Sequence, residues 1–227
     1  MNIIQIFTEY YQYFLRGTRT TILISLITVF CGAILGCLVA LMRISNCKPL
    51  QAFSKLYITV IRGTPMLVQL YIVYYQLSFI QYPSGTIWGV DMERAIPCVI
   101  ALSLNSAAYI AEVFRAGIQA VDVGQMEAAR SCGMTSAQAM RFIILPQAIK
   151  NILPAIANEF VTIIKESSIC YTIGVGEIMY AVTSIKGATF RIAEPLVVAT
   201  AVYFCLTFPT SKIIEHFERK MSVGDKR

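Results

Sequence analysis

Long uncharged stretches alternate with short basic segments along the 227 residues of the chain. A helix rises ~1.5 Å per residue, so about 20 apolar residues cross the ~30 Å hydrocarbon core of a bilayer. Five stretches are mostly apolar and long enough to do so: about 17–43, 62–82, 94–117, 150–174 and 192–215. The pattern predicts an all-α polytopic membrane protein with five transmembrane helices in one domain, 1–227.

Two segments beside these stretches have an identifiable local signal. The second stretch opens with Thr64 and Pro65, which suit a helix cap and a first-turn proline, and it ends at a turn over 82–85. Trp88 then belongs to a short interfacial piece. Residues 3–14 are amphipathic, and we expect them to form a helix lying on the outer membrane surface.

The distribution of basic residues predicts the orientation. If the N-terminus is outside, thirteen of the 19 Lys and Arg residues fall in inner loops or the C-terminal tail, five fall outside, and Lys165 lies in a span. Cytoplasmic loops of membrane proteins carry the excess of Lys and Arg. We therefore expect the N-terminus outside and the C-terminus in the cytoplasm.

Composition supports the membrane assignment and narrows the chemistry. Hydrophobic residues make up 56 % of the chain and charged residues 14 %, whereas soluble domains are about a quarter charged. The net charge of +6 is scattered between apolar stretches, which does not suit nucleic acid. The seven cysteines form no CxxC pair and fit small buried hydrophobic residues, and one His offers no metal cluster. No metal site is expected.

The connection 118–149, on the predicted cytoplasmic side, is too long to be a simple loop. Residues 123–131 can form a short helix, and Gly133 can end it. Thr135 can cap a second helix that stops before Pro146. We therefore expect this connection to be folded and functional.

The same connection contains a recognisable motif: Glu127-Ala128-Ala129, then Gly133, and further on Leu145-Pro146. It resembles the EAA loop of permease subunits of bacterial ABC importers. Four further segments resemble the polar amino-acid uptake subgroup of that family: 62–70, 107–118, 145–148 and 158–169. One departure is Glu166, where the subgroup commonly has Asp.

The resemblance implies a type I ABC importer permease fold with a cytoplasmic coupling helix, in which Glu127, Ala128, Ala129 and Gly133 dock into the ATPase. The small alanines allow a close approach, while Glu127 can pair with the partner or hold the loop internally.

The same resemblance implies partners and location. These are two copies of a cytoplasmic ABC ATPase that binds ATP and Mg, a second permease copy, related or identical, and an extracytoplasmic solute-binding protein. The chain would bind no cofactor and no nucleic acid, would contact membrane lipid, and would sit in the bacterial cytoplasmic membrane. Transport would proceed by alternating access.

Polar residues in the fourth span share one face. At 100° per residue, they fall within about 120° of one another: Asn158, Glu159, Thr162, Lys165 and Glu166. Ionised groups are costly in hydrocarbon, so this stripe must face protein or water. Glu159 lies deepest and, with Asn158 and Thr162, is the leading candidate to contact an ammonium group of the substrate. Lys165 and Glu166 fit ion pairing near the outer mouth equally well.

The third span carries a narrower stripe of Asn105, Tyr109 and Glu112. Asn105 and Tyr109 are candidates to line the substrate path, or alternatively to make hydrogen bonds between helices. Glu112 is close to Arg115 in sequence, which favours a local ion pair. Pro154 and Gly174 are expected to interrupt the fourth segment next to the path.

We interpret the chain as the membrane subunit of an ATP-driven importer of a polar amino acid or derivative. It is not itself expected to be an enzyme, because it has no GxxxxGK[ST] phosphate loop. The alternatives are a stand-alone secondary transporter or channel, which leaves the loop motif unexplained, and an intramembrane enzyme, which lacks a catalytic signature.

Overall fold

The structure, a computed structural model, describes residues 2–77, 79–80, 85–87 and 89–222. Its helices are α1 (Ile3–Ile44), α2 (Lys48–Gly63), α3 (Met66–Gln76), α4 (Met92–Gln119), α5 (Val123–Ser131), α6 (Ser136–Ala139), α7 (Leu145–Glu166), α8 (Ile178–Thr189) and α9 (Ala193–Ser222). A π-helical turn, Met140–Ile144, joins α6 to α7, and a 3-10 turn, Ser167–Ile173, follows α7. Strands β1 (Thr86–Ile87) and β2 (Val90–Asp91) form a small antiparallel pair.

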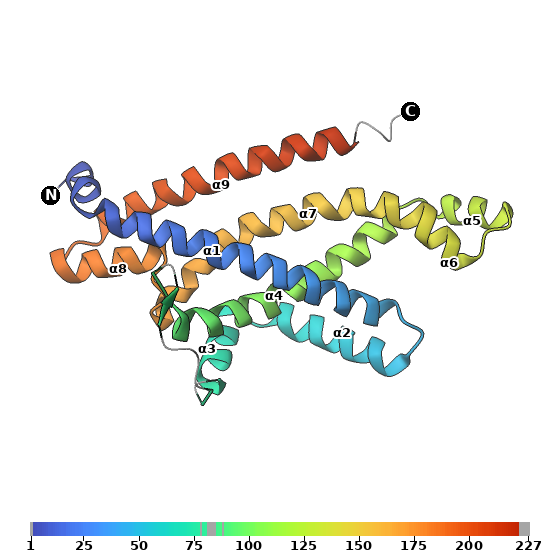
Figure 1. Ribbon diagram of the computed structural model, residues 1–227, viewed down its shortest axis with the longest axis horizontal. Helices are drawn as coiled ribbons and strands as arrows, with labels where there is room; N and C mark the ends of the chain where they lie inside the picture. Colours follow the sequence, from blue (N-terminus) through green and yellow to red (C-terminus); the bar gives the residue numbers. More distant parts are fainter. Residues whose placement is uncertain (1, 78, 81–84, 88, 223–227) are drawn as a thin grey trace.

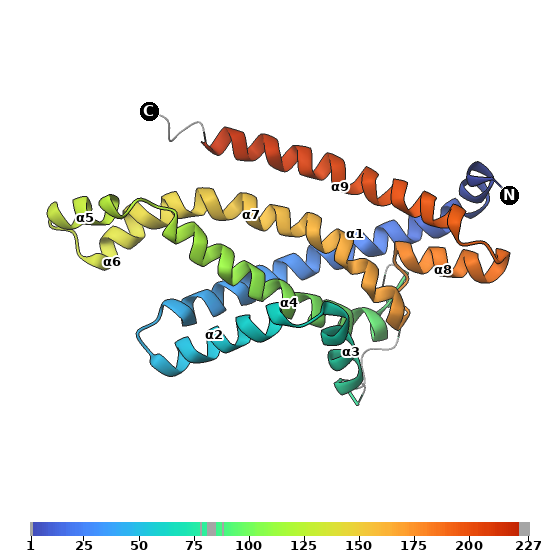
Figure 2. The ribbon, with the colours of Figure 1, turned by 180° about the vertical axis from the view of Figure 1, so that it is seen from behind.

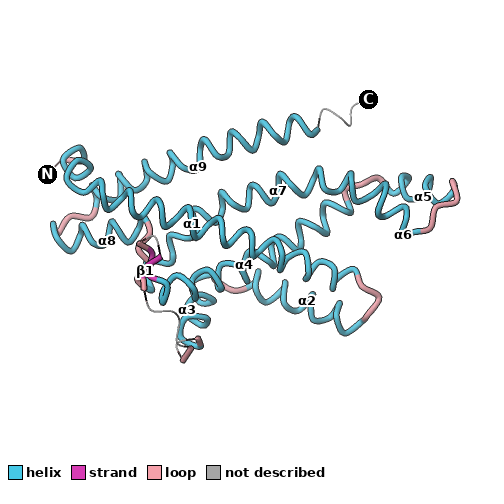
Figure 3. Tube along the Cα trace, in the orientation of Figure 1, coloured by secondary structure: helices cyan, strands magenta, loops and turns pink. Residues whose placement is uncertain are grey.

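The long helices run side by side along the longest axis of the molecule (Figures 1 and 2). The N-terminus, α8 and the β-hairpin lie toward one end, whereas α5 and α6 lie at the other; Figure 3 shows how little of the described chain is not helical. Within the described residues, four helices are long and apolar enough to cross a membrane, and the bent pair α2–α3 gives a fifth candidate. These features confirm the predicted all-α polytopic class.

The second membrane segment differs from the expected 62–82. It comprises α2 and α3, which meet at an angle of 110°. Thr64 is extended (φ −122°, ψ 148°) because a residue before proline is excluded from helical backbone by the Pro65 ring. The expected turn at 82–84 and Trp88 lie outside the described residues. Arg62, which we assigned to an inner loop, instead lies in the last turn of α2, just before this break and 14 residues after Lys48, the first residue of the helix.

Helix α1 is continuous from Ile3 to Ile44, so residues 3–14 are not a separate helix, although Figure 1 shows the first turns at an angle to the remainder. Glycines on α1 permit very close packing. A Cβ on Gly36 would lie 2.8 Å from Cβ of Ile110 in α4, and one on Gly17 would lie 2.9 Å from the backbone of Glu177. Small residues let membrane helices approach in this way. Here Gly36 brings α4 close to α1, and Gly17 brings the start of α8 close to α1.

The connection 118–149 is folded largely as expected. Helix α5 spans the predicted residues, Gly133 adopts φ +87°, and the Thr135 hydroxyl accepts a hydrogen bond of 3.2 Å from the Gln138 amide. The second helix, however, does not stop before Pro146. Proline lacks an N–H and crowds the preceding turn, and the π-helical turn absorbs this with a Leu145 N to Met140 O bond. The loop therefore runs into α7 without a break.

The fourth segment and the cysteines each depart from one expectation. Pro154 lies inside α7 without ending it, whereas Gly174, at φ +82°, does end the 3-10 turn. Cys98 and Cys170 form a disulfide between α4 and the 3-10 turn, with Cα atoms 6.3 Å apart. These two cysteines are therefore a covalent link rather than merely small apolar side chains.

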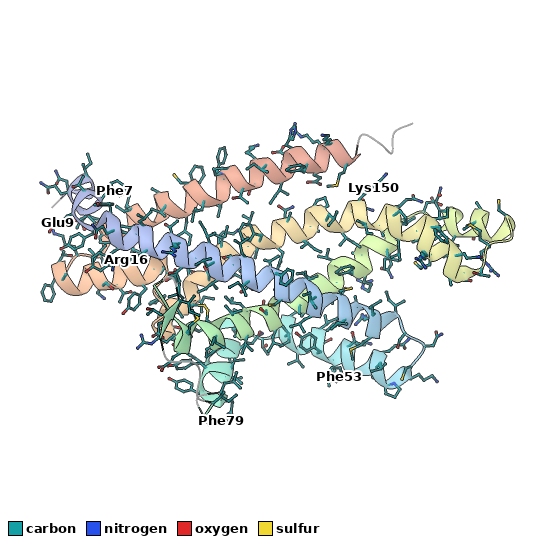
Figure 4. All side chains as sticks on the ribbon, viewed as in Figure 1. Phe7, Glu9, Arg16, Phe53, Phe79 and Lys150 are labelled. Atoms are coloured by element: carbon teal, nitrogen blue, oxygen red, sulfur yellow. A yellow bond between two sulfur atoms is a disulfide. The ribbon has the colours of Figure 1, made fainter. Side chains whose placement is uncertain are left out.

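Large apolar side chains cover the outside of the bundle, as a lipid-facing surface requires. Phe53 on α2 and Phe79 beyond α3 both point away from the body in Figure 4, and they are 59 % and 79 % exposed. Hydrocarbon is the environment that stabilises such a surface.

Candidate functional site

Glu159 lies between the two helices that carry the predicted polar stripes. Its Oε1 accepts a hydrogen bond of 2.9 Å from the Ser106 hydroxyl, so α7 and α4 are joined at this point. The side chain is half-buried and makes no ion pair in the described part of the chain. A carboxylate in a membrane segment needs a positive or hydrogen-bonding partner, and Ser106 supplies only part of this need.

Asn105, one residue before Ser106, makes its hydrogen bond to a different helix, α3. It is 4 % exposed and donates a hydrogen bond of 3.0 Å to Oε1 of Gln69 in α3. The Gln69 amide nitrogen in turn donates to the carbonyls of Ile61 and Thr64, at 2.7 and 3.1 Å. These carbonyls lose their helical partners at the α2–α3 break. The geometry thus favours interhelical hydrogen bonding, the alternative that the sequence left open for Asn105.

Tyr109 lies one turn further along α4 and is 39 % exposed. The guanidinium of Arg62 lies over its ring, 5.2 Å from the centroid. Glu112 forms the expected local ion pair, with Arg115 Nη2 at 2.7 Å, and a longer one with Arg43 of α1 at 3.7 Å. Glu112 is therefore neutralised within the chain.

The stripe on α7 is divided between two sides of the helix. Whereas Glu159 faces α4, Asn158 lines a cavity of about 280 Å³ between α7 and α9, beside Lys150, which Figure 4 labels there. Thr162 donates a hydrogen bond of 3.3 Å to the Asn158 carbonyl. Two turns further along α7, Lys165 lines a cavity of about 510 Å³ with residues of α3, α8 and α9. The structure therefore does not bring Asn158 to the Glu159–Ser106 contact.

The motif in the loop lies at the far end of the bundle (Figure 1). Ala129 is 7 % exposed and packs inward, while Glu127 and Ala128 are exposed. Gly133 turns the chain, and the Arg130 guanidinium secures the turn by donating a hydrogen bond of 2.8 Å to the Met134 carbonyl. The Glu127 carboxylate makes no hydrogen bond or ion pair to a described residue, so it does not hold the loop together.

Glu177 was not predicted as a notable residue from the sequence. It lies between the 3-10 turn and α8, is fully buried, and accepts hydrogen bonds from the amides of Met179 and Tyr180 at 2.9 and 2.8 Å and from the Tyr203 hydroxyl at 2.8 Å. Burial raises the pKa of this carboxyl to about 7, although these hydrogen bonds oppose the shift. Its position directly before a helix of mostly small and apolar residues, where an acidic side chain can cap the helix, was the available signal.

Taken together, apolar spans, a folded exposed loop at one end and an intramembrane carboxylate that meets no basic side chain among the described residues are typical of a multi-span transport permease. The model of the family described as binding-protein-dependent transport system inner membrane component matches residues 32–223. The chain belongs to this family, the membrane subunits of ABC importers.

Individual relatives are similar over nearly the whole chain. The arginine transport system permease protein ArtQ of Bacillus subtilis is 39 % identical over 213 residues, 94 % of each chain. A putative glutamine transport system permease protein of Rickettsia conorii is 38 % identical over 93 % of this chain and 94 % of its own. A crystal structure of an amino acid ABC transporter with histidines superposes with a TM-score of 0.88 at 42 % identity, covering 97 % and 99 % of the two chains. These relatives are transport permeases.

Proposed function

We propose that this permease imports an amino acid, with Glu159 accepting the substrate's ammonium group. One observation carries the proposal: Glu159 is a half-buried intramembrane carboxylate whose described contact is a single hydroxyl, Ser106, with no cation beside it. A substrate ammonium would complete this environment. The names of the similar permeases, which refer to arginine and glutamine, agree with an amino-acid substrate.

Tyr109, Thr162 and Asn158 complete the proposed path. Tyr109 presents a partly exposed ring one turn from Ser106. Asn158 borders the inner cavity, and Thr162 donates a hydrogen bond to the Asn158 carbonyl. Asn105 acts by positioning Gln69 at the α2–α3 break. We place the stripe of α7 along the route between the outer and inner cavities.

The loop around α5 is the proposed docking element for a cytoplasmic ATPase, which would bind and hydrolyse ATP in place of this chain. Exposed Glu127 and Ala128 form the contact, the buried Ala129 holds the element against the rest of the loop, and Gly133 ends it with a left-handed residue. Because the Glu127 carboxylate has no described internal partner, we assign it to a basic group of the ATPase.

A second permease copy and an extracytoplasmic solute-binding protein complete the assembly that we propose. The family description, a binding-protein-dependent transport system, agrees with the latter. Two permeases, identical or related, would be served by two ATPases, because each copy presents one docking loop.

The proposed orientation, with the N-terminus outside, has a direct test in the natural cysteines. Cys132 lies in the docking loop and Cys47 in the α1–α2 connection, and both are exposed. A membrane-impermeant maleimide should label both in inside-out vesicles and neither in right-side-out vesicles. Labelling with the reverse sidedness would refute the orientation.

Function is tested by reconstituting the permease with its ATPase and binding protein in liposomes. We expect ATP-dependent uptake of arginine, histidine or glutamine, reduced at least tenfold by Glu159→Gln, which removes the charge at constant size. Glu127→Arg should abolish uptake without weakening amino-acid binding. Glu93→Gln, at an exposed position at the start of α4, is the matched control. Uptake by the permease alone, without ATP, would instead favour a stand-alone transporter.

A further inference from the structure

Near the break between α2 and α3, a second charged group, Arg62, meets the helix that carries the partner of Glu159. The Arg62 guanidinium lies over the Tyr109 ring, and Tyr109 is one turn from Ser106, the residue that donates to Glu159. Side chains three residues apart on a helix lie on one face, with Cβ atoms about 5–6 Å apart. The guanidinium and the carboxylate therefore each contact the same turn of α4, one through Tyr109 and the other through Ser106.

Arg62 has no counter-charge in the described part of the chain. Its side chain is exposed, and its described interaction is with the Tyr109 ring. The acidic residue one turn further along α4, Glu112, is already held by Arg115 and Arg43. A cation within a transmembrane segment is costly unless it meets an anion or water, so the position suits an anionic ligand.

We propose that Arg62 binds the α-carboxylate of the amino acid whose ammonium group Glu159 accepts. This inference rests on the proposed function and extends it to the chemical group recognised. A guanidinium presents a planar fork that matches a carboxylate in a bidentate manner, and the Tyr109 ring holds that plane in place. The amide of Gln69 ties the carbonyls of Ile61 and Thr64 on either side of Arg62, which fixes the backbone from which the guanidinium projects.

A consequence for specificity follows. The ammonium and carboxylate groups are common to all α-amino acids. A site built from Arg62 and Glu159 therefore binds the part of the substrate that all of them share. The permease then accepts several amino acids that carry both charges and discriminates against molecules that lack one of them. Side-chain selection is left to the binding protein.

The experiment measures equilibrium binding to the purified permease–ATPase complex in lipid nanodiscs, without the binding protein. The probes are radiolabelled arginine, histidine and glutamine, each compared with its own carboxamide, which keeps the ammonium and side chain but is uncharged at the former carboxylate. For the wild type we expect the carboxamide to bind roughly 10- to 100-fold more weakly, the range for a hydrogen bond to a charged group.

Variants separate the two charges. Arg62→Gln should weaken amino-acid binding to the level of the carboxamide and leave carboxamide binding unchanged, whereas Glu159→Gln should weaken both probes by the same factor. Arg62→Lys keeps the charge but loses the fork, so discrimination should fall to an intermediate value. If the Arg62→Gln complex does not assemble, the Arg62→Lys variant still tests the role of the guanidinium. Lys55→Gln is the matched control, because Lys55 is exposed on the same face of α2, ~10 Å from Arg62.

The outcomes distinguish the two proposals. If the wild-type complex binds an amino acid and the Arg62 variants still discriminate against the carboxamide as strongly as wild type, the role of Arg62 is refuted while amino-acid transport stands. If the wild type binds none of the three amino acids and the complete transporter takes up none of them, the proposed function fails as well.

Discussion

Glu177 should make the stability of the permease depend on pH, because its environment changes its affinity for a proton. In the folded chain the carboxyl is fully buried and its pKa is about 7, against an ordinary value of 4.5. The folded state therefore binds the proton more tightly than the unfolded state. Between pH 4.5 and 7, unfolding releases this proton, so the free energy of unfolding falls as pH rises.

The magnitude follows from the same values. One pKa unit corresponds to 1.36 kcal/mol, so the contribution that is complete below pH 4.5 and lost by about pH 7 amounts to about 3 kcal/mol. For a chain of this size, that corresponds to a fall in melting temperature of roughly 6–12 °C. The deprotonated residue still caps α8 through Met179 and Tyr180, and this keeps the loss from being larger.

Glu177→Gln removes the titration while keeping the shape. In glutamine, one of the two carboxylate oxygens is replaced by an NH2 group, which donates and does not accept. Placed at Oε2, it cannot accept the hydrogen bonds from the Met179 amide and the Tyr203 hydroxyl, so the free energy of unfolding at low pH falls by about 1–3 kcal/mol. At pH 8 the wild-type carboxyl is ionised in a buried position, whereas glutamine is neutral. The variant avoids the cost of burying that charge, which offsets the lost hydrogen bonds. The variant should therefore melt below wild type at pH 5 and at or above it at pH 8.

Melting is followed on the assembled transporter in detergent, by fluorescence-detected size-exclusion chromatography after heating at pH 5, 6, 7 and 8. Glu93→Gln, an exposed acidic position, should give a curve parallel to wild type. If the Glu177→Gln curve is also parallel to wild type across this range, the reasoning about the buried carboxyl is refuted.

Two further perturbations test the packing of the bundle. Replacing Cys98 and Cys170 by Ser removes a disulfide between residues 72 positions apart and should lower the free energy of unfolding by about 4 kcal/mol. The melting temperature should fall accordingly. Dithiothreitol should lower the melting temperature of the wild type by the same amount and leave that of the variant unchanged. Gly36→Ala should destabilise by about 1–3 kcal/mol, because its Cβ would lie 2.8 Å from Ile110. Gly187→Ala, with no atom within 4 Å of the new Cβ, should be neutral or stabilising. Equal melting of the two glycine variants would contradict the close α1–α4 contact.

The sequence could predict those features that depend on local periodicity. Long apolar runs predicted the helical class. Gly133 and Thr135 predicted the end of α5 and the start of α6, because such residues act on the backbone next to them. Helix α2 was missed because Lys48, Lys55 and Arg62 recur every seven residues along its exposed face, so a search for uncharged runs began the segment 14 residues late. The π-helical turn was missed for another reason. It accommodates Pro146 by a shift in backbone hydrogen bonding, and no pattern of side chains predicts such a shift.

The candidate site was predicted less completely, since its contacts join residues far apart in the chain. Glu159 could be identified from the cost of a charge at its depth. Its partner Ser106 could not, because a serine in a membrane helix is ordinary until another helix places a carboxylate 2.9 Å away. The role of Asn105 likewise depends on Gln69, 36 residues earlier, whose amide reaches back to a break that only the folded chain reveals.

The continuity of the helix from the docking loop into the membrane has a mechanical consequence. From Ser136 to Glu159 there is no interruption of the helical backbone, and 23 residues span ~35 Å. A rod of that length that tilts by about 5° about its loop end displaces its far end by about 3 Å, the length of one hydrogen bond. A small rotation imposed at the loop end therefore suffices to separate Glu159 from Ser106. The length of helix between the proposed docking loop and Glu159 sets how far Glu159 moves for a given rotation of the loop.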